Sequence, residues 1–406
     1  MNRSKLTTRT ILATAALLCS ASTFAKAELD FWSWRQEDAK AYNEIIAAFE
    51  KSNPDISINY TAHEAKSYAT VLTTALTGGA GPDIIHTRAY GAFESVAAPG
   101  YLEPLNGKVD LSGFSKDELL GVTLRSDGKV YSVPMASQTI LVYYNVDLLA
   151  AQKITPPTTW DEFVAAAKKL KSSGIMPLAN GTKDGWTVEV MSGAFMPNFY
   201  GESFFGEVTA GSTDFEDARY VGAMEKFGEL REFLPQGHEG VDYATMKQLF
   251  NSGAAAMFVG GSWEIAGFRK AGINFDIMAG PAAKAGEPQM VATWLDGGYA
   301  VNSGSENKEA ALKFARFLAT QEFGQMLTDK LANVAAVDGA VSSDPMLAKI
   351  SEFHDSATPY IMLVGYRFKK PTGSTLLQNG LQELMAGKKS AAAVAKEVSD
   401  GIKASK

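Results

Sequence analysis

The chain has 406 residues, a formal net charge of −7, 46% hydrophobic residues and 20% charged residues. These values are typical of a globular protein with two or more folding units, and they exclude a disordered or fibrous chain. The acidic balance argues against nucleic acid as a partner, because no excess of lysine and arginine is available to neutralise phosphates. The single cysteine, Cys19, excludes an intramolecular disulfide and a cysteine-based metal site.

The first 27 residues predict a secretory signal peptide. Three basic residues come first, an apolar run over 11–19 follows, and Ala25-Lys26-Ala27 is a small-x-small cleavage site. Cleavage after Ala27 leaves an exported, periplasmic protein that begins at Glu28, lacks cysteine and has a net charge of −11, because four basic residues and no acids are removed. A lipid-attachment site at Cys19 is disfavoured, because the preceding Leu18 is not small.

The first part of the exported chain alternates between strand and helix patterns. Apolar or alternating runs predict strands over 29–34, 56–60 and 83–87, and helical spacing predicts helices over 41–49 and 71–76. Strand and helix in alternation predict a parallel sheet with covering helices. Ligands of such sheets bind beyond the carboxyl ends of the strands. Those ends carry the polar and aromatic segments Trp34-Arg35-Gln36-Glu37, His63-Glu64 and Thr87-Arg88-Ala89-Tyr90.

The α/β pattern restarts in the second part of the chain. Strands are expected over 139–144, 175–179 and 254–259, and a helix is expected over 302–320. Thr159-Trp160-Asp161-Glu162 is a capping box that opens a further helix, which continues to Leu170. Because no linker rich in Pro, Gly or Ser separates the two parts, we expect two intimately joined α/β lobes with more than one crossing of the chain between them.

The sequence holds no motif that specifies catalysis. It lacks G-x-S-x-G, H-E-x-x-H and a P-loop, and its histidines do not have the spacing of metal ligands along a helix. The acid pairs Glu37-Asp38 and Asp161-Glu162 stand at helix starts, where they stabilise the helix dipole. A glycosidase needs two carboxylates that face one sugar, and Glu37, Glu64 and Asp83 are the available candidates. We expect no catalytic residue, no metal and no cofactor.

The six tryptophans favour a binding cleft. Trp160 lies inside the capping box and is expected to pack, whereas Trp34 ends the first strand. Trp186, Trp263 and Trp294 lie beside glycines in predicted loops. Tryptophan faces stack on the apolar faces of sugars, while polar neighbours bind the hydroxyls. The turns Gly260-Gly261 and Gly297-Gly298 let backbone N–H groups approach a ligand closely.

Several motifs occur in a familiar order. The export signal is followed by Gly81-Pro82-Asp83-Ile84-Ile85, Val142-Tyr143-Tyr144-Asn145, Pro157-Thr158-Thr159-Trp160-Asp161-Glu162-Phe163 and Gly260-Gly261-Ser262-Trp263. In this order they resemble the extracellular solute-binding proteins of carbohydrate ABC transporters, the group that includes maltose-binding protein. The resemblance covers essentially the whole exported chain.

The resemblance implies a two-lobed periplasmic-binding-protein fold, each lobe a mainly parallel sheet flanked by helices, joined by hinge strands that close over a sugar. It implies hinges at 137–143 and 290–300 and a third crossing near 318–334. Lobe 1 is then 28–138 plus about 295–325, and lobe 2 is 139–294 plus about 326–406. The segment 373–389 is similar to the C-terminal helical region of the family. The implied partners are a carbohydrate and the permease subunits of an importer in the inner membrane, and the protein is expected to be a monomer.

The candidate ligand-binding residues combine the strand ends, the loop tryptophans and the contacts implied by the resemblance. Arg367 joins them because it follows a late Gly-Tyr loop, and maltodextrin is a doubtful ligand because Thr87 stands where maltose-binding protein carries Trp. The set is Trp34, Arg35, Gln36, Glu37, Glu64, Thr87, Arg88, Tyr90, Gln138, Trp186, Gly261, Trp263, Trp294, Asp296 and Arg367.

The charge of the ligand depends on what the arginines bind. If Glu37 and Glu64 pair with Arg35 and Arg88, hydroxyls are the targets; if these acids turn away, an anionic sugar group can take an arginine fork. The acidic exported chain favours a neutral oligosaccharide or glycoside. Two other functions stay open: a ferric-ion-binding protein that uses Tyr143-Tyr144, although alternation along a strand points these rings apart, and an exported enzyme that acts on glycans.

Overall fold

The computed structural model describes residues 26–404. The predicted signal peptide lies outside the described residues except for Lys26 and Ala27, and Cys19 lies outside them as well. Ala27 is the first residue of β1 (Ala27–Ser33), and its N–H donates to the carbonyl oxygen of Asp55 at 2.9 Å. The predicted cleavage point therefore falls at the outer end of the first strand.

Five strands form the first sheet, in the order β2-β1-β3-β10-β4. β1 pairs in parallel with β2 and β3, and β10 runs antiparallel to both of its neighbours. The other strands are β2 (Ile56–Ala62), β3 (Ile84–Arg88), β4 (Ser132–Pro134) and β10 (Gly297–Val301). The predicted strand–helix alternation of this part is thus confirmed, and the carboxyl ends of β1, β2 and β3 meet at one edge.

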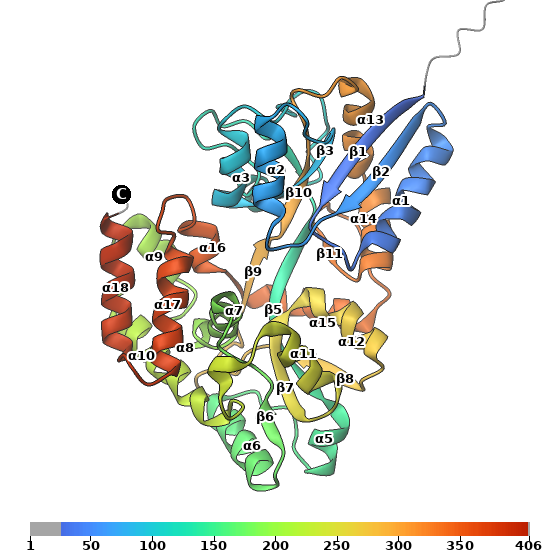
Figure 1. Ribbon diagram of the computed structural model, residues 1–406. Helices are drawn as coiled ribbons and strands as arrows, with labels where there is room; N and C mark the ends of the chain where they lie inside the picture. Colours follow the sequence, from blue (N-terminus) through green and yellow to red (C-terminus); the bar gives the residue numbers. More distant parts are fainter. Residues whose placement is uncertain (1–25, 405–406) are drawn as a thin grey trace, which may run out of the picture.

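Helices cover both faces of the first sheet (Figure 1). On one face, α1 places Tyr42 and Phe49 against Phe31 of β1, as the helical spacing predicts. On the other face, Leu72 of α2 and Phe93 of α3 pack against Ile85 of β3. The helices of this half are α1 (Ala39–Ser52), α2 (Tyr68–Thr77), α3 (Tyr90–Ala97), α4 (Lys116–Leu120), α13 (Lys308–Leu318) and α14 (Gln321–Leu331).

The second sheet has the order β12-β9-β5-β7-β6, with β8 and β11 also paired to β5. β5 runs antiparallel to β7, β8, β9 and β11, and only the pairs β6–β7 and β12–β9 are parallel. The expectation of a mainly parallel sheet is therefore wrong here, because an apolar run specifies a buried strand but not its direction. The strands are β5 (Ala136–Asn145), β6 (Met176–Leu178), β7 (Ala255–Gly261), β8 (Phe275–Met278), β9 (Val291–Leu295), β11 (Val334–Ala335) and β12 (Ala357–Pro359).

Helices also surround the second sheet (Figure 1). The capping box that opens α6 is confirmed: the Thr159 hydroxyl accepts from the Glu162 N–H, and the Glu162 carboxylate accepts from the Thr159 N–H. The helices are α5 (Val146–Ala151), α6 (Trp160–Ser172), α7 (Gly185–Phe195), α8 (Pro197–Tyr200), α9 (Phe204–Ala210), α10 (Ala218–Glu229), α11 (Tyr243–Asn251), α12 (Ile265–Ala271), α15 (Pro345–Phe353), α16 (Ile361–Gly365), α17 (Gly373–Met385) and α18 (Ala391–Ala404).

The chain passes between the two sheets at three points. Met135 joins β4 to β5, Asp296 joins β9 to β10, and Ala332-Asn333 join α14 to β11. Lys330 near the end of α14 binds Glu44 of α1 at 2.7 Å, so α14 contacts the first half of the molecule over its length. Figure 1 shows β5 and β9 running side by side between the halves.

One predicted helix begins later in the chain than expected, and none of the described helices could span a membrane. The helix expected over 302–320 is shorter and begins at Lys308, because Asn302–Asn307 form a turn in which the Asn302 side chain accepts from the Gly304 N–H. No helix within residues 26–404 has both the length and the apolar character needed to cross a membrane.

The packing role of Trp160 can be tested by truncation. This residue is 4% exposed and contacts the rings of Phe163, Phe195 and Phe199. We expect Trp160→Ala to lower the free energy of unfolding, measured by urea denaturation, by about 3–5 kcal/mol, because it leaves a cavity in the core. Val341→Ala is the control: this residue is 73% exposed, and its truncation should change stability by less than about 0.5 kcal/mol. Equal effects of the two changes would contradict the assignment.

Candidate ligand-binding cleft

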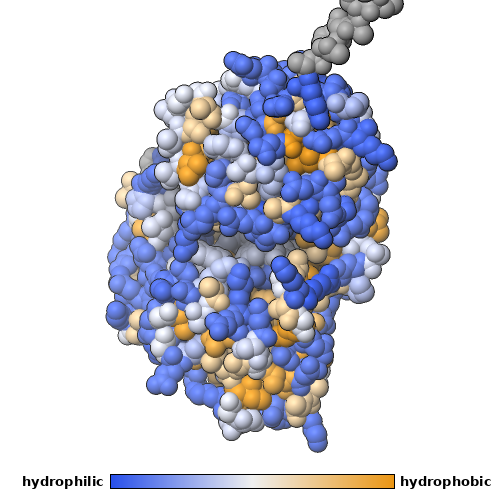
Figure 2. Space-filling view, turned by 45° about the vertical axis from the view of Figure 1, so that its right-hand side comes forward, coloured by the Kyte–Doolittle hydropathy of each residue, from blue (hydrophilic) through white to orange (hydrophobic). Residues whose placement is uncertain are grey.

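A hollow separates the two halves of the molecule (Figure 2). The carboxyl ends of β1 and β3 approach it from the first half, and Gly261, which ends β7, lies opposite Ile140 of β5 in the second half. The ligand-binding edge that the sequence predicts for the first sheet therefore faces the second half across this cleft.

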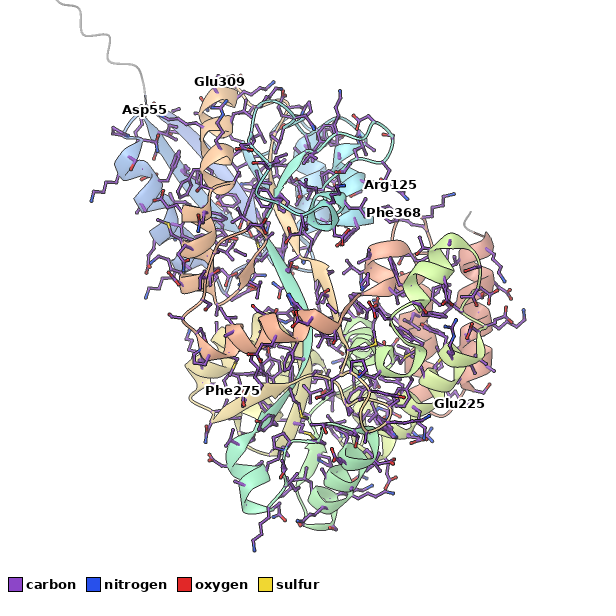
Figure 3. The ribbon with its side chains drawn as sticks, turned by 180° about the vertical axis from the view of Figure 1, so that it is seen from behind. Asp55, Arg125, Glu225, Phe275, Glu309 and Phe368 are labelled. Atoms are coloured by element: carbon purple, nitrogen blue, oxygen red, sulfur yellow. The ribbon has the colours of Figure 1, made fainter. Side chains whose placement is uncertain are left out.

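Contacts between the halves border the cleft. Lys66 lies 4.0 Å from Asp184, and the Arg125 guanidinium lies 3.5 Å from the centre of the Phe368 ring (Figure 3). Gly91 of α3 lies so close to the carbonyl of Arg367 that an added Cβ would be 2.2 Å from its oxygen. The two halves therefore touch at the rim, and glycine is required at one of these contacts.

Arg35 sits at the floor of the cleft and is only 3% exposed. Its Nη1 donates to Asp296 Oδ2 at 2.8 Å, and its Nε donates to Asp38. Although burial disfavours the charge, Asp38 and Asp296 raise the pKa of Arg35 above its usual value. This guanidinium is therefore a fixed charge that ties the end of β1 to the crossing at Asp296.

Gln138 extends this network across the second half. It is fully buried; its Nε2 donates to Asn333 Oδ1 at 2.8 Å and lies 3.4 Å from Asp296 Oδ2, while Ser262 Oγ donates to its Oε1 at 2.6 Å. Residues from all three crossings thus meet at one buried amide. Tyr90 supports the same region, because its hydroxyl accepts from the Leu295 N–H at 3.2 Å.

The Trp34 ring is covered rather than offered to a ligand. His86 stacks at 4.0 Å between ring centres, the Arg88 guanidinium lies 3.7 Å from the ring centre, and Trp34 is 5% exposed. Burial, with the cations Arg35 and Arg88 nearby, lowers the pKa of His86 well below its usual value, so the imidazole is neutral. The Trp34 ring therefore helps to hold the Arg88 guanidinium in place.

An aromatic wall on the second half comprises Trp186, Tyr243, Trp263, Trp294 and Tyr360. Ring centres lie 4.7 Å apart for Trp186–Tyr243, 5.7 Å for Trp263–Trp294 and 5.1 Å for Trp294–Tyr360. The Trp263 ring lies directly on Gly261, where an added Cβ would come within 1.7 Å of it. The structure thus brings together three tryptophans that the sequence analysis placed in separate loops.

Glu264 is a residue of this wall that the sequence analysis missed. It is 3% exposed, and its Oε1 accepts from Trp263 Nε1 at 2.9 Å and from the Tyr243 hydroxyl. Burial raises the pKa of Glu264 to about 7, against the opposing effect of Tyr243, Lys247 and Trp263. Its position directly after Gly-Gly-Ser-Trp was the available signal, because an acid in a tight turn beside an indole N–H is a ready acceptor.

Other predicted site residues do not belong to the aromatic wall. Thr87 is 1% exposed, and its hydroxyl contacts Ser132 Oγ at 2.9 Å and donates to the Gly298 carbonyl, so it stabilises the sheet. Arg367 Nε donates to Ser374 Oγ at 2.6 Å, and its Nη2 lies 3.5 Å from buried Glu189. The exposed residues are Gln36, Glu37 and Glu64.

The geometry does not support the two other functions. Tyr143 donates to the Gly261 carbonyl and Tyr144 donates to Asp276, and their rings belong to different core clusters, so they do not form a paired iron site. Asp83 precedes β3 and accepts from the Asp30 N–H, so it lies at the strand end opposite to the cleft. Within residues 26–404, no group of three or more His, Cys, Asp and Glu is arranged to hold a metal.

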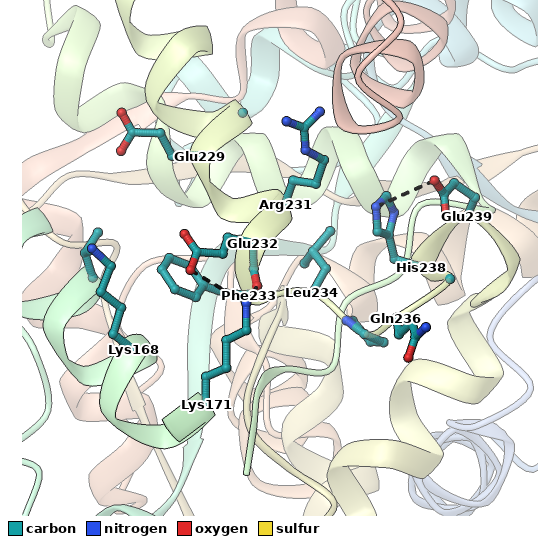
Figure 4. A pocket seen from close by; sticks show the side chains of 14 residues that line it. Lys168, Lys171, Glu229, Arg231, Glu232, Phe233, Leu234, Gln236, His238 and Glu239 are labelled. Atoms are coloured by element: carbon teal, nitrogen blue, oxygen red, sulfur yellow. Dashed lines mark hydrogen bonds and ion pairs between the residues drawn. The ribbon is translucent and has the colours of Figure 1, made fainter. Parts of the chain in front are cut away.

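A separate hollow of about 920 Å³ lies beside α6 and the short helical turns at 230–233 and 238–240 (Figure 4). Charged residues of both signs line it, and Lys171 binds Glu232 there at 3.6 Å. None of the predicted site residues lines this hollow.

The chain is similar to known proteins in sequence and in fold. The model of the family "Bacterial extracellular solute-binding protein" matches residues 32–325. The galactooligosaccharide-binding protein of Bacillus subtilis is 27% identical, over 85% of this chain and 79% of that protein. The sn-glycerol-3-phosphate-binding periplasmic protein of Brucella melitensis is 24% identical, over 90% and 87%. A solved chitin oligosaccharide binding protein, 21% identical, shares the fold with a TM-score of 0.79 over 94% of this chain and 99% of that one.

The buried carboxyl of Glu264 predicts a pH-dependent stability. Its pKa is about 7 in the folded protein and near 4.3 in an unfolded chain. Its contribution is therefore fully present below about pH 4.3 and is lost as the pH rises through 7. Relative to Glu264→Gln, the unmodified protein should lose roughly 3 kcal/mol of unfolding free energy between these limits.

Urea denaturation across this pH range measures the effect. Glu225→Gln, a change at an exposed acid outside the cleft, should follow the unmodified protein. A parallel course of the unmodified protein and Glu264→Gln would show that Glu264 titrates as it does in water.

Proposed function

Since the chain belongs to the family of bacterial extracellular solute-binding proteins, we propose that it binds a sugar in the cleft and delivers it to the permease of an ABC importer. The observation that carries the proposal is the aromatic wall facing the polar strand ends of the first sheet. Aromatic faces suit the apolar faces of a sugar ring, and arginine and carboxylate groups suit its hydroxyls.

The mechanism that we propose is closure of two lobes about the three crossings. Lobe 1 corresponds to 28–138 plus about 295–325, extended through α14, and lobe 2 to 139–294 plus the remainder. A ligand that bridges Arg88 on one lobe and Trp263 on the other stabilises the closed state, because it makes both sets of contacts only there. The closed protein then docks on permease subunits in the inner membrane, and it acts as a monomer.

The proposal assigns no chemistry to the cleft. Glu37 is exposed and Glu264 accepts from Trp263 and Tyr243, and the proposal gives neither carboxylate a catalytic role. One relative is named as a galactooligosaccharide-binding protein and another as an sn-glycerol-3-phosphate-binding protein. The ligand therefore varies within the family, and the ligand of this chain depends on the residues of its own cleft.

Export follows from the same family membership, and we place the protein in the periplasm after signal-peptide cleavage. We expect the exported chain to begin at Glu28. Intact-mass measurement of protein released from the periplasm tests this prediction, and a lipid adduct on Cys19 would contradict it.

Binding should depend on the aromatic wall. A thermal-shift screen with mono-, di- and trisaccharides and sugar acids identifies the strongest binder, which at 100-fold over Kd should stabilise the protein by about 2.7 kcal/mol. For that sugar, Trp263→Ala should lower affinity about tenfold or more in calorimetry, because stacking and its apolar area are lost. Trp160→Ala should lower the melting temperature and leave affinity unchanged; the reverse order would move the cleft elsewhere.

Closure should also be visible in solution. Small-angle scattering with the same sugar should give a smaller radius of gyration than without it, and tryptophan fluorescence should change. An unchanged radius at saturating sugar would remove lobe closure from the mechanism.

A further inference from the structure

Three arginines surround the floor of the cleft, and their partners differ. Arg35 is neutralised by Asp38 and Asp296. Arg367 binds Ser374 and lies near Glu189. Arg88 is the last residue of β3, and its side chain forms neither a hydrogen bond nor an ion pair with any residue of the described chain, 26–404; its Cζ lies 3.7 Å from the centre of the Trp34 ring.

The guanidinium of Arg88 has no hydrogen-bond acceptor of its own within residues 26–404. Asp296 is the one carboxylate that acts on it appreciably, and that group already accepts from Arg35 at 2.8 Å and lies 3.4 Å from Gln138 Nε2. Burial lowers the pKa of Arg88 to about 10, and the cations Arg35 and Arg367 act in the same direction. The side chain remains charged at neutral pH, and its five N–H donors have no acceptor among the described residues.

The acids that were expected to neutralise the cleft turn elsewhere. Glu64 is exposed, and its carboxylate accepts from Ser67. Glu37 is exposed and acts electrostatically on Arg35 nearby as well as on Glu264 and Tyr243, on the other side of the cleft. The expectation of a neutral ligand rests on possible pairing of Glu37 and Glu64 with the arginines and on the acidic net charge. Within residues 26–404, neither acid forms a hydrogen bond or an ion pair with an arginine, although Glu37 helps to raise the pKa of Arg35.

We propose that Arg88 binds an anionic oxygen group of the ligand, so that the solute is an acidic sugar carrying a carboxylate, sulfonate or phosphate. This inference rests on the proposed function. A guanidinium presents two parallel N–H groups that match two oxygens of such an anion, and stacking on Trp34 fixes the plane of that fork. Trp34 thereby acts as a positioning residue, and the aromatic wall opposite receives the body of the sugar.

The distribution of charge supports an anion rather than a hydroxyl. A partly buried guanidinium whose N–H donors lack acceptors is costly to desolvate, and an anionic ligand offsets that cost more completely than a hydroxyl does. The chain has a formal net charge of −7, and the predicted cleavage after Ala27 would make it −11. Long-range attraction therefore does not deliver the anion, and the selectivity has to come from the unpaired N–H donors of Arg88, which act at distances well within a Debye length of about 8–10 Å.

The test compares sugars that differ in one group. Methyl glucoside and methyl galactoside are titrated beside their 6-carboxylates, 6-sulfonates and 6-phosphates, which distinguishes the three sources of anionic oxygen. At least one acidic member should bind about tenfold or more tightly than its neutral counterpart, and its affinity should fall between about 25 and about 250 mM NaCl.

Variants assign the effect to Arg88. Arg88→Gln should lower affinity for the acidic sugar about tenfold or more, and Arg88→Lys should retain part of it, because the charge stays while the fork is lost. Arg219→Gln is the matched control: this arginine also lies over a ring, Phe204 at 5.5 Å, but is paired with Asp217 and Glu207 outside the cleft. Melting temperatures of all variants verify folding, and Arg88→Lys keeps the test decisive if Arg88→Gln is unstable.

The outcomes separate this inference from the proposed function. Neutral sugars that bind as tightly as the acidic ones, with equal losses on Arg88→Gln, would overturn the anionic ligand and leave sugar binding intact. Absence of binding by every neutral and acidic saccharide in both screens would overturn both.

Discussion

The ion pair between Arg35 and Asp296 is the interaction on which the organisation of the cleft depends. It joins the carboxyl end of β1 to the crossing between β9 and β10, and both side chains are nearly enclosed. Removing Arg35 would leave the enclosed carboxylates of Asp38 and Asp296 without their cation, which is strongly destabilising. The shared contacts of Gln138 with Asn333, Ser262 and Asp296 extend this constraint to the other crossings. The floor is therefore tied to all three crossings, and the closure that we propose has to take place around these contacts.

The ion pairs and hydrogen bonds at the floor of the cleft determine which groups remain for a ligand. Charges that hold the protein together are paired: Arg35 with two aspartates, and Glu189 with Ser374, Gln378 and Arg367. Arg88 is left with a ring contact alone, and Trp186 and Trp263 stay partly exposed. Buried pairs contribute little net stability but fix geometry, so the unpaired groups stand in defined positions.

The sequence predicts the first sheet, the capping box of α6 and the core face of α1, because each follows from local periodicity or from a short cap motif. It predicts the strand ends that face the cleft, because parallel strands share one edge. It does not predict that β5 runs against its neighbours, since an apolar run looks the same in either direction. It also does not reveal that Thr87 turns into the sheet or that Arg88 covers Trp34, because both depend on side-chain contacts between segments distant in sequence.

The two sides of the cleft present different chemical groups to a ligand. On the first half, Trp34 is sealed by His86 and Arg88, so that side offers a planar cation in place of an aromatic face. On the second half, Gly261 has no side chain and lets the Trp263 ring lie flat against the strand end, which turns that side into an apolar surface with Glu264 behind it. A ligand gains both contacts at once only if it has an acceptor group at one end and an apolar ring face at the other. A molecule with one of these features would occupy one lobe and would leave the equilibrium between open and closed states unchanged, since a ligand shifts that equilibrium only by its differential affinity.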